Sequence, residues 1–187
     1  MDQAPPYLTG QFLLAMPGMG DPRFERAVIA MCMHDAEGAL GIGLGRIVPR
    51  ITFHKLLRQL DIEPGAAPDV AIHLGGPVEP QRGFLLHSLD WGGQESLQVS
   101  DRWAMTATLD ILRAIAEGKG PSRWVIALGY AGWGAGQLEG ELARPGWLNV
   151  EGATDLIYAT PAEQRWAAGL GMAGVDSRML VSGAGTA

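Results

Sequence analysis

The distribution of apolar residues divides the chain into short segments that change type often. Apolar runs typical of buried strands lie at residues 11–15, 27–34, 70–74, 83–87 and 125–128, and further strands are expected at 39–45, 97–99, 103–106 and 155–158. Hairpin-like turns join several of these segments, and the turn at residues 35–38 is expected to pair the strands at 27–34 and 39–45 as a hairpin. Helices come at irregular intervals. The pattern predicts a single α/β domain over residues 1–187, with a mixed, mainly antiparallel sheet and flanking helices. Residues 1–10 are expected to form a loose N-terminal arm, and residues 182–187 a frayed tail.

Helix start signals precede the remaining periodic segments. They lie at Asp21-Pro22, Thr52, Thr108, Gln137 and Thr160-Pro161-Ala162-Glu163. The last of these is a capping box, and it predicts a helix that continues to about residue 170.

Two glycine-rich stretches stand out within this pattern. In residues 39–45, Leu40, Ile42 and Leu44 alternate with glycines, so one face of the expected strand is bare backbone. A bare face indicates the close approach of another element or of a ligand, and the sequence leaves both open.

The second stretch follows the buried strand at residues 125–128, and the chain is expected to be organised around it. Gly129, Gly132, Gly134 and Gly136 are interleaved with Tyr130 and Trp133. The spacing is neither a dinucleotide fingerprint nor a phosphate-binding loop. A tight structural turn and a cradle of backbone N–H groups for a ligand remain as alternatives.

The composition argues against several classes of function. The formal net charge is −6 and no run of Lys and Arg occurs, which argues against direct nucleic-acid binding. No apolar run approaches the ~20 residues of a membrane span, so no membrane association is expected. Cys32 is the single cysteine, which excludes an intrachain disulfide and fits a reducing cytoplasm.

Cys32 and His34 are the only catalytic candidates, and they are weak ones. They lie two apart on an expected strand, so both side chains should point to one face, where the imidazole could favour a thiolate. The alternative is a cysteine that packs as a small apolar residue. The four histidines show no metal-ligand spacing, so neither a metal nor a cofactor is expected.

Seven blocks in order identify a family resemblance. They are FLLAMPGM, DPRFERAV, CMHDAEGALG, LGGPVEPQRGFLLH, LGYAGWGAGQLEGEL, GWL and DLIYATPAEQRWAAGLGMAGVD. With them the chain closely resembles the bacterial YqgE/AlgH family along nearly its full length. The resemblance implies a sheet bent into a pseudo-barrel, a small cytoplasmic protein, a transcriptional-regulator label and no established catalytic residues. The chain departs at Gly45-Arg46-Ile47, where the family tends to have Asn-Arg-Pro.

The leading hypothesis is a non-enzymatic protein that binds an unidentified protein or small molecule and affects transcription indirectly. A thiol-based enzyme or redox sensor that uses Cys32 and His34 is the alternative. The expected binding surface joins two turns, and its candidate residues are Gly75, Gly76, Pro77, Arg82, Tyr130, Trp133, Gly134 and Gln137. The sequence leaves the oligomeric state open.

Overall fold

The computed structural model describes residues 7–17, 22–93, 95–152 and 154–181. Its strands are β1 (Gln11–Ala15), β2 (Val28–Asp35), β3 (Gly38–Gly43), β4 (Ile47–Thr52), β5 (Ala71–Leu74), β6 (Val78–Ser88), β7 (Leu97–Gln98), β8 (Trp103–Thr106), β9 (Trp124–Gly134) and β10 (Trp147–Glu151). Its helices are α1 (Phe53–Gln59), α2 (Leu109–Ala116), α3 (Gln137–Leu142), α4 (Thr154–Tyr158), α5 (Ala162–Met172) and α6 (Ser177–Val181), with a short 3-10 helix at Pro22–Phe24.

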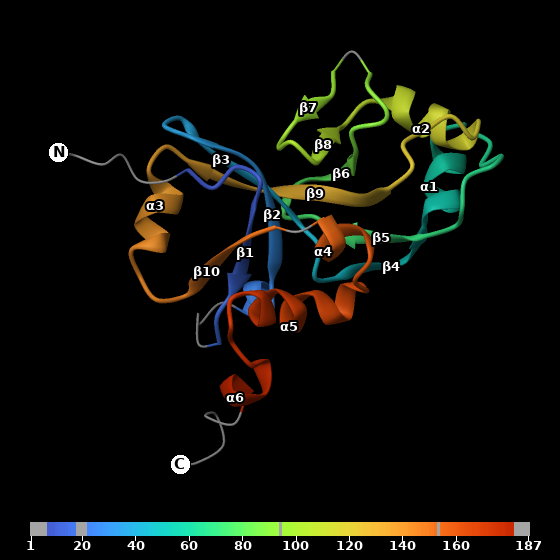
Figure 1. Cartoon of the computed structure of the whole chain (residues 1–187). Coiled ribbons are helices and arrows are strands. Elements are labelled where there is room, and N and C mark those ends of the chain that lie inside the picture. The colour runs from blue at the N-terminus through green and yellow to red at the C-terminus, as the bar shows by residue number, and fades with distance from the viewer. Residues whose placement is uncertain (1–6, 18–21, 94, 153, 182–187) are drawn as a thin grey trace.

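The strands form one curled sheet, as the family resemblance implies (Figure 1). Its order is β10-β1-β2-β3-β9-β6-β8-β7, and β4 and β5 join it through the pairing of β5 with β9. All pairs are antiparallel except β5 with β9. The predicted hairpin of β2 and β3 is confirmed.

Strand β9 is longer than expected and holds the sheet together. The predicted turn from residue 129 is wrong, because the strand continues through Gly134 and its last residues pair with β3, Ala131 against Gly41 and Gly134 against Gly38. On the same strand, Ala127 and Leu128 pair with β5. The strand beside β9 therefore changes from β5 to β3 near Gly129, a residue with a φ of 75°.

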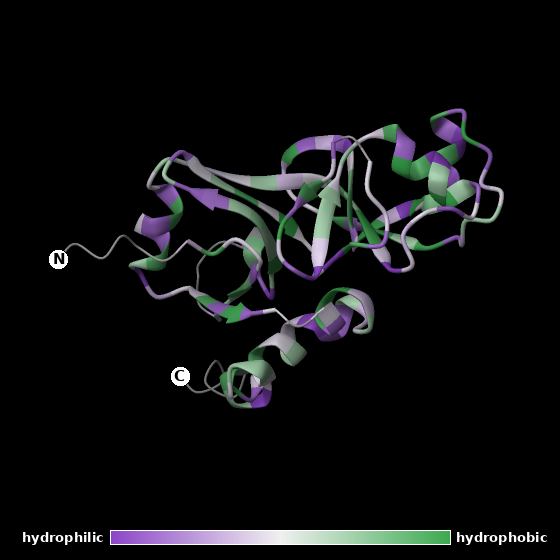
Figure 2. Cartoon of the chain, turned by 45° about the horizontal axis from the view of Figure 1, so that its top comes forward, coloured by the Kyte–Doolittle hydropathy of each residue, from purple (hydrophilic) through white to green (hydrophobic). Residues whose placement is uncertain are grey.

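Three apolar clusters cover the sheet. One packs under α4 and α5, a second lies between the sheet and the α1–α2 pair, and a third lies under α3 and the start of the chain. Figure 2 shows the α1–α2 pair at one end of the sheet and the α4–α6 group below it, with hydrophobic and hydrophilic residues interspersed along the strands. None of the helices in the described part of the chain has the length and apolar character that a membrane span requires.

Two further differences from the sequence analysis concern the ends of the chain. Residues 155–158 form α4 and not a strand, with Leu156 and Ile157 both buried. Of the expected loose arm, residues 1–6 lie outside the described part, whereas Leu8 is only 3% exposed and packs into the third cluster. The expected frayed tail at 182–187 also lies outside the described residues.

Candidate functional site

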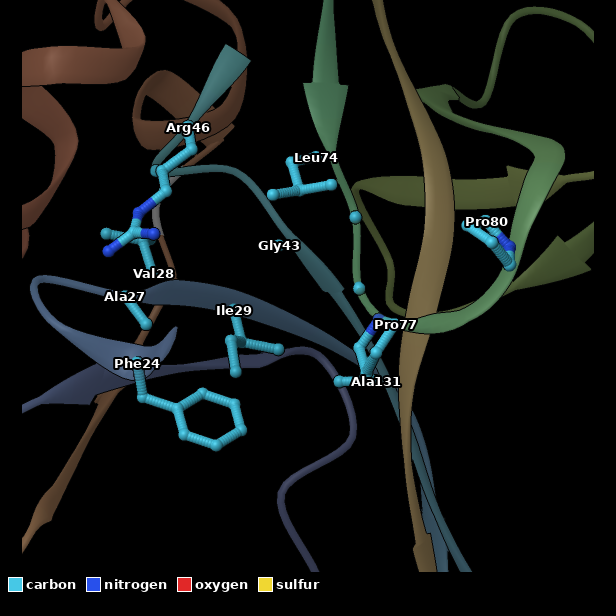
Figure 3. Close-up of a pocket in the computed structure, with 13 residues that line it drawn as sticks. Phe24, Ala27, Val28, Ile29, Gly43, Arg46, Leu74, Pro77, Pro80 and Ala131 are labelled. Atoms are coloured by element: carbon cyan, nitrogen blue, oxygen red, sulfur yellow. The ribbon is translucent and has the colours of Figure 1, made fainter. Parts of the chain in front are cut away.

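An apolar pocket of about 350 Å³ opens between the β2–β3 hairpin and the turn from β5 to β6 (Figure 3). The residues that line it are Phe24, Ala27, Val28, Ile29, Gly43, Gly45, Arg46, Leu74, Gly75, Gly76, Pro77, Pro80 and Ala131. We call it the hairpin pocket. Three of the predicted surface residues, Gly75, Gly76 and Pro77, are part of its wall.

The pocket exists because β5 and β3 meet the same edge of β9 and then diverge. At the crossing the Gly43 N–H donates to the Gly75 carbonyl over 2.7 Å, and the Gly75 N–H donates to the Leu128 carbonyl over 2.8 Å. Beyond the crossing, β3 stays with β2 while the chain after Leu74 turns away toward β6. The space between them is lined by the small side chains of Ala27 and Ala131.

The glycines of the turn are required by this crossing. A Cβ at Gly76 would lie 2.1 Å from the carbonyl carbon of Tyr130, and one at Gly75 would lie 2.1 Å from the Gly129 oxygen. A Cβ at Gly43 would likewise lie 2.6 Å from the Leu74 oxygen. The bare face of β3 is thus explained by the close approach of another element, although Gly43 also borders the pocket.

Arg46 is the one charged residue among the 13 described residues that line the hairpin pocket. Its guanidinium lies on the side formed by Ala27 and Val28 (Figure 3). Nη2 donates to the carbonyls of Pro22 and Glu25 over 3.3 and 3.2 Å. None of the described side chains in this lining could serve as a nucleophile or as a general acid or base.

The other predicted surface residues lie elsewhere. Arg82 and Tyr130 border a separate pocket of about 260 Å³. There the Arg82 guanidinium lies 3.5 Å from a Glu79 carboxylate oxygen and 5.3 Å from the centre of the Phe84 ring, which Tyr130 contacts edge-on.

Trp133 is buried, contrary to the expectation that a glycine-rich loop would leave it open. Its exposed fraction is 8%, and its Nε1–H donates to a Glu141 carboxylate oxygen over 3.1 Å. The Gly134 N–H donates to the Gln137 side chain over 3.0 Å. Trp133, Gly134 and Gln137 together connect β9 to α3. The turn at Gly76 contacts the β9 backbone at Tyr130, whereas the Trp133 side chain bonds to Glu141 of α3.

Cys32 and His34 do not share a face, because a β-bulge interrupts the pairing between Met31 and Met33. Cys32 is 1% exposed in the first apolar cluster, where burial raises the pKa of its thiol far above the ordinary value. The His34 ring turns the other way: it accepts the Leu8 N–H at Nδ1 and lies 3.1 Å from Glu139. This geometry gives the thiol no base and no access to solvent.

A buried polar cluster surrounds Arg165, and the sequence did not predict it. Arg165 is 4% exposed, and its guanidinium donates to the carbonyls of Leu156, Ile157 and Leu44 and to His73 Nε2, at 2.6–2.9 Å. One signal in the sequence could have indicated this cluster, because Arg165 stands among the residues that form the buried face of α5. These residues are Ala162, Arg165, Trp166, Gly169 and Leu170. The cluster fastens α4 and α5 to the sheet.

His73 is neutral in this cluster. Its Nδ1 donates to the Ile126 carbonyl over 2.9 Å, so Nε2 accepts from Arg165. Burial, and secondly the Arg165 charge, lower the pKa of His73 from 6.5 to about 4. Burial also lowers the pKa of Arg165 to about 10, which leaves it charged at neutral pH. Across the described residues no group of three or more His, Cys, Asp or Glu could hold a metal ion.

Comparison with known proteins decides the family. The family model described as AlgH-like matches residues 12–178. The chain belongs to the AlgH-like family. A "UPF0301 protein" of Rhizorhabdus wittichii is 61% identical over 98% of this chain and 99% of its own, and one of Sphingopyxis alaskensis is 54% identical over the full length of both. The solution structure of the AlgH protein from Pseudomonas aeruginosa is 38% identical, with a TM-score of 0.81 and full coverage of both chains. A crystal structure of a Corynebacterium diphtheriae protein is 21% identical, has a TM-score of 0.70, covers 90% of this chain and 87% of its own, and shows the same fold.

Gly45 begins the stretch at which the chain departs from the pattern of the family resemblance. Gly45 lines the hairpin pocket, and a Cβ at this position would lie 3.1 Å from the Arg26 carbonyl oxygen.

Proposed function

We propose that this AlgH-like protein is a non-enzymatic cytoplasmic protein that acts by binding an apolar ligand, either a small molecule or a side chain of a protein partner, in the hairpin pocket. Any effect on transcription is then indirect. The observation that carries the proposal is the pocket itself, an apolar cavity whose volume lies in the range of small-molecule sites.

The walls of the pocket support binding without rearrangement. Hydrogen bonds between Gly43, Gly75 and Leu128 fix the backbone on one side, and the hairpin fixes the other. A preformed apolar site binds without the cost of ordering its own walls. The buried thiol of Cys32 and the absence of catalytic groups among the described lining residues disfavour an enzyme.

The net charge supports an indirect effect on transcription. At −6 the protein repels the phosphate backbone of a duplex, and the positive charge that drives nucleic-acid binding is lacking. A ligand-dependent contact with another protein requires no such charge.

The test is titration with N-phenyl-1-naphthylamine, a neutral apolar dye that becomes fluorescent in an apolar site. Wild-type protein is expected to bind it saturably, and Ala27→Phe, which fills the pocket, is expected to abolish binding. Ala114→Phe is the matched control, because Ala114 is also half-buried but lies on α2, away from the pocket. Equal dye binding by Ala27→Phe and wild type, with both proteins folded, would refute the proposal.

A further inference from the structure

The one cation at the edge of the hairpin pocket indicates the class of ligand. We infer that the pocket binds a small amphipathic carboxylate, with the aliphatic chain inside the pocket and the carboxylate on Arg46. The inference rests on the proposed function and adds the chemistry of the ligand to it.

Arg46 has the capacity to bind an anion. Its Nη2 donates to two backbone carbonyls, and a guanidinium has five N–H donors, so those on Nε and Nη1 have no acceptor among the described residues. None of the ion pairs between described residues includes Arg46. The free N–H groups on Nε and Nη1 do not share an edge of the planar guanidinium, so a carboxylate would accept a single charge-assisted hydrogen bond from one of them.

The surroundings of Arg46 show where such a ligand would extend. Arg46 also borders a second pocket, together with Glu25, Arg26, Glu163 and Arg178. Arg178 there pairs with Asp176, and Glu25 and Glu163 place two carboxylates in the same lining. A carboxylate ligand in that second pocket would therefore meet negative as well as positive charges. The hairpin pocket differs, because Arg46 is its one charged lining residue among those described and the rest of its wall is apolar.

The wall favours an aliphatic chain over a peptide. A peptide brings amide groups into the pocket, and each one that stays unpaired there costs free energy. The backbone of the wall offers few partners, because the N–H groups of Ala27, Gly43, Leu74 and Gly75 already donate to other carbonyls of the protein. An alkyl carboxylate has a single polar group, and Arg46 satisfies it.

The test is calorimetric titration of the full-length protein with hexanoate, octanoate and decanoate below micelle-forming concentrations. The dissociation constant is expected to fall about fourfold for each added methylene until the pocket is full. Decanol and decylammonium are the charge controls. Decanoate is expected to bind at least about tenfold more tightly than decanol, because a hydrogen bond to a charged group contributes more than one to a neutral group.

Two variants isolate the contribution of Arg46. Arg46→Met is expected to remove the preference for decanoate over decanol, whereas Arg46→Lys keeps part of it. Thermal unfolding of both variants shows whether the loop held by the Pro22 and Glu25 carbonyls stays folded. Ala27→Phe is expected to abolish binding of all the ligands.

The outcomes separate the two proposals. If decanol, decanoate and the neutral dye bind equally, and Arg46→Met changes nothing, the carboxylate inference is wrong and the apolar site stands. If the dye and the whole alkyl series fail to bind wild-type protein, both are wrong. If an N-acetylated tripeptide that ends in leucine with a free carboxylate binds more tightly than decanoate, the ligand is a peptide terminus and the inference is overturned.

Discussion

The buried pair of His73 and Arg165 predicts that acid destabilises the protein well above the pH at which carboxylates titrate. The pKa of His73 is lowered from 6.5 to about 4 by burial and by the Arg165 charge. When the protein unfolds, the ring regains its ordinary pKa. Between these values the unfolded chain binds a proton that the folded protein does not, so stability falls as the pH falls.

The size of the effect follows from the two values. Each pKa unit corresponds to about 1.4 kcal/mol, so the whole difference amounts to about 3 kcal/mol. The part lost between pH 7.5 and pH 5 is about 2 kcal/mol, and above pH 7.5 almost nothing changes. Hydrogen bonds from His54, Ser122 and Arg178 lower the pKa of Asp69, Asp90 and Asp176, respectively, so the contributions of these carboxylates are lost only at lower pH.

The assay is urea unfolding, followed by circular dichroism, at several pH values in this window. Burial also lowers the pKa of His87, which contributes to the pH dependence in the same direction. The contribution of His73 is therefore measured as the difference between wild type and a His73 variant. His73→Gln keeps one donor and one acceptor but does not titrate, and the variant is expected to show about 2 kcal/mol less pH dependence than wild type. His54→Gln is the control, because the His54 side chain is 25% exposed. Equal pH dependence in wild type and His73→Gln would refute the reasoning.

Three further predictions test other parts of the structure. The Cys32 thiol is buried and its pKa is raised, so it is expected to react with a disulfide reagent only when the protein unfolds. Reaction at the rate of a free thiol would instead support a thiol-based enzyme or redox sensor. Gly76→Ala is expected to lower the free energy of unfolding by at least about 2 kcal/mol, because a Cβ there meets the β9 backbone, whereas Gly140→Ala, with open space and a helical position, should raise it by up to about 1 kcal/mol in the same urea assay. No mobility shift is expected with duplex DNA at physiological salt, and a shift that survives nonspecific competitor would contradict the indirect role.

Local signals in the sequence were sufficient for most elements. The turn at residues 35–38 between two apolar runs predicts the β2–β3 hairpin, and the start signals at Thr52 and residues 160–163 place α1 and α5. The expected capping box is wrong, because Pro161 is the N-cap of α5 and no side chain there makes a capping hydrogen bond. Such signals act through neighbouring residues, so they can be read without knowledge of the tertiary fold.

Elements that depend on hydrogen-bond partners far away in the sequence could not be predicted from local signals. The glycines after Leu128 are typical of a turn, but β3 supplies the hydrogen bonds that extend β9 to Gly134. The apolar run at Leu156 and Ile157 fits a strand or a buried helix equally well. The carbonyls of these two residues accept hydrogen bonds from Arg165, nine and eight residues further along the chain. The bulge at Cys32 carries no local signal either, yet its one extra residue turns His34 to the other face.

The hairpin pocket and the glycine patterns have one cause, which is the close crossing of β3 and the chain after β5. Gly43, Gly75 and Gly76 lack a Cβ so that β3 and the chain after β5 can cross within backbone hydrogen-bonding distance. Two chains that touch at a crossing diverge on either side of it, and the side chains beyond the crossing must fill the gap. Here Ala27 and Ala131 are too small to do so, and a cavity of about 350 Å³ remains. The glycines are therefore structural, and the opening that follows from them is the binding site we propose.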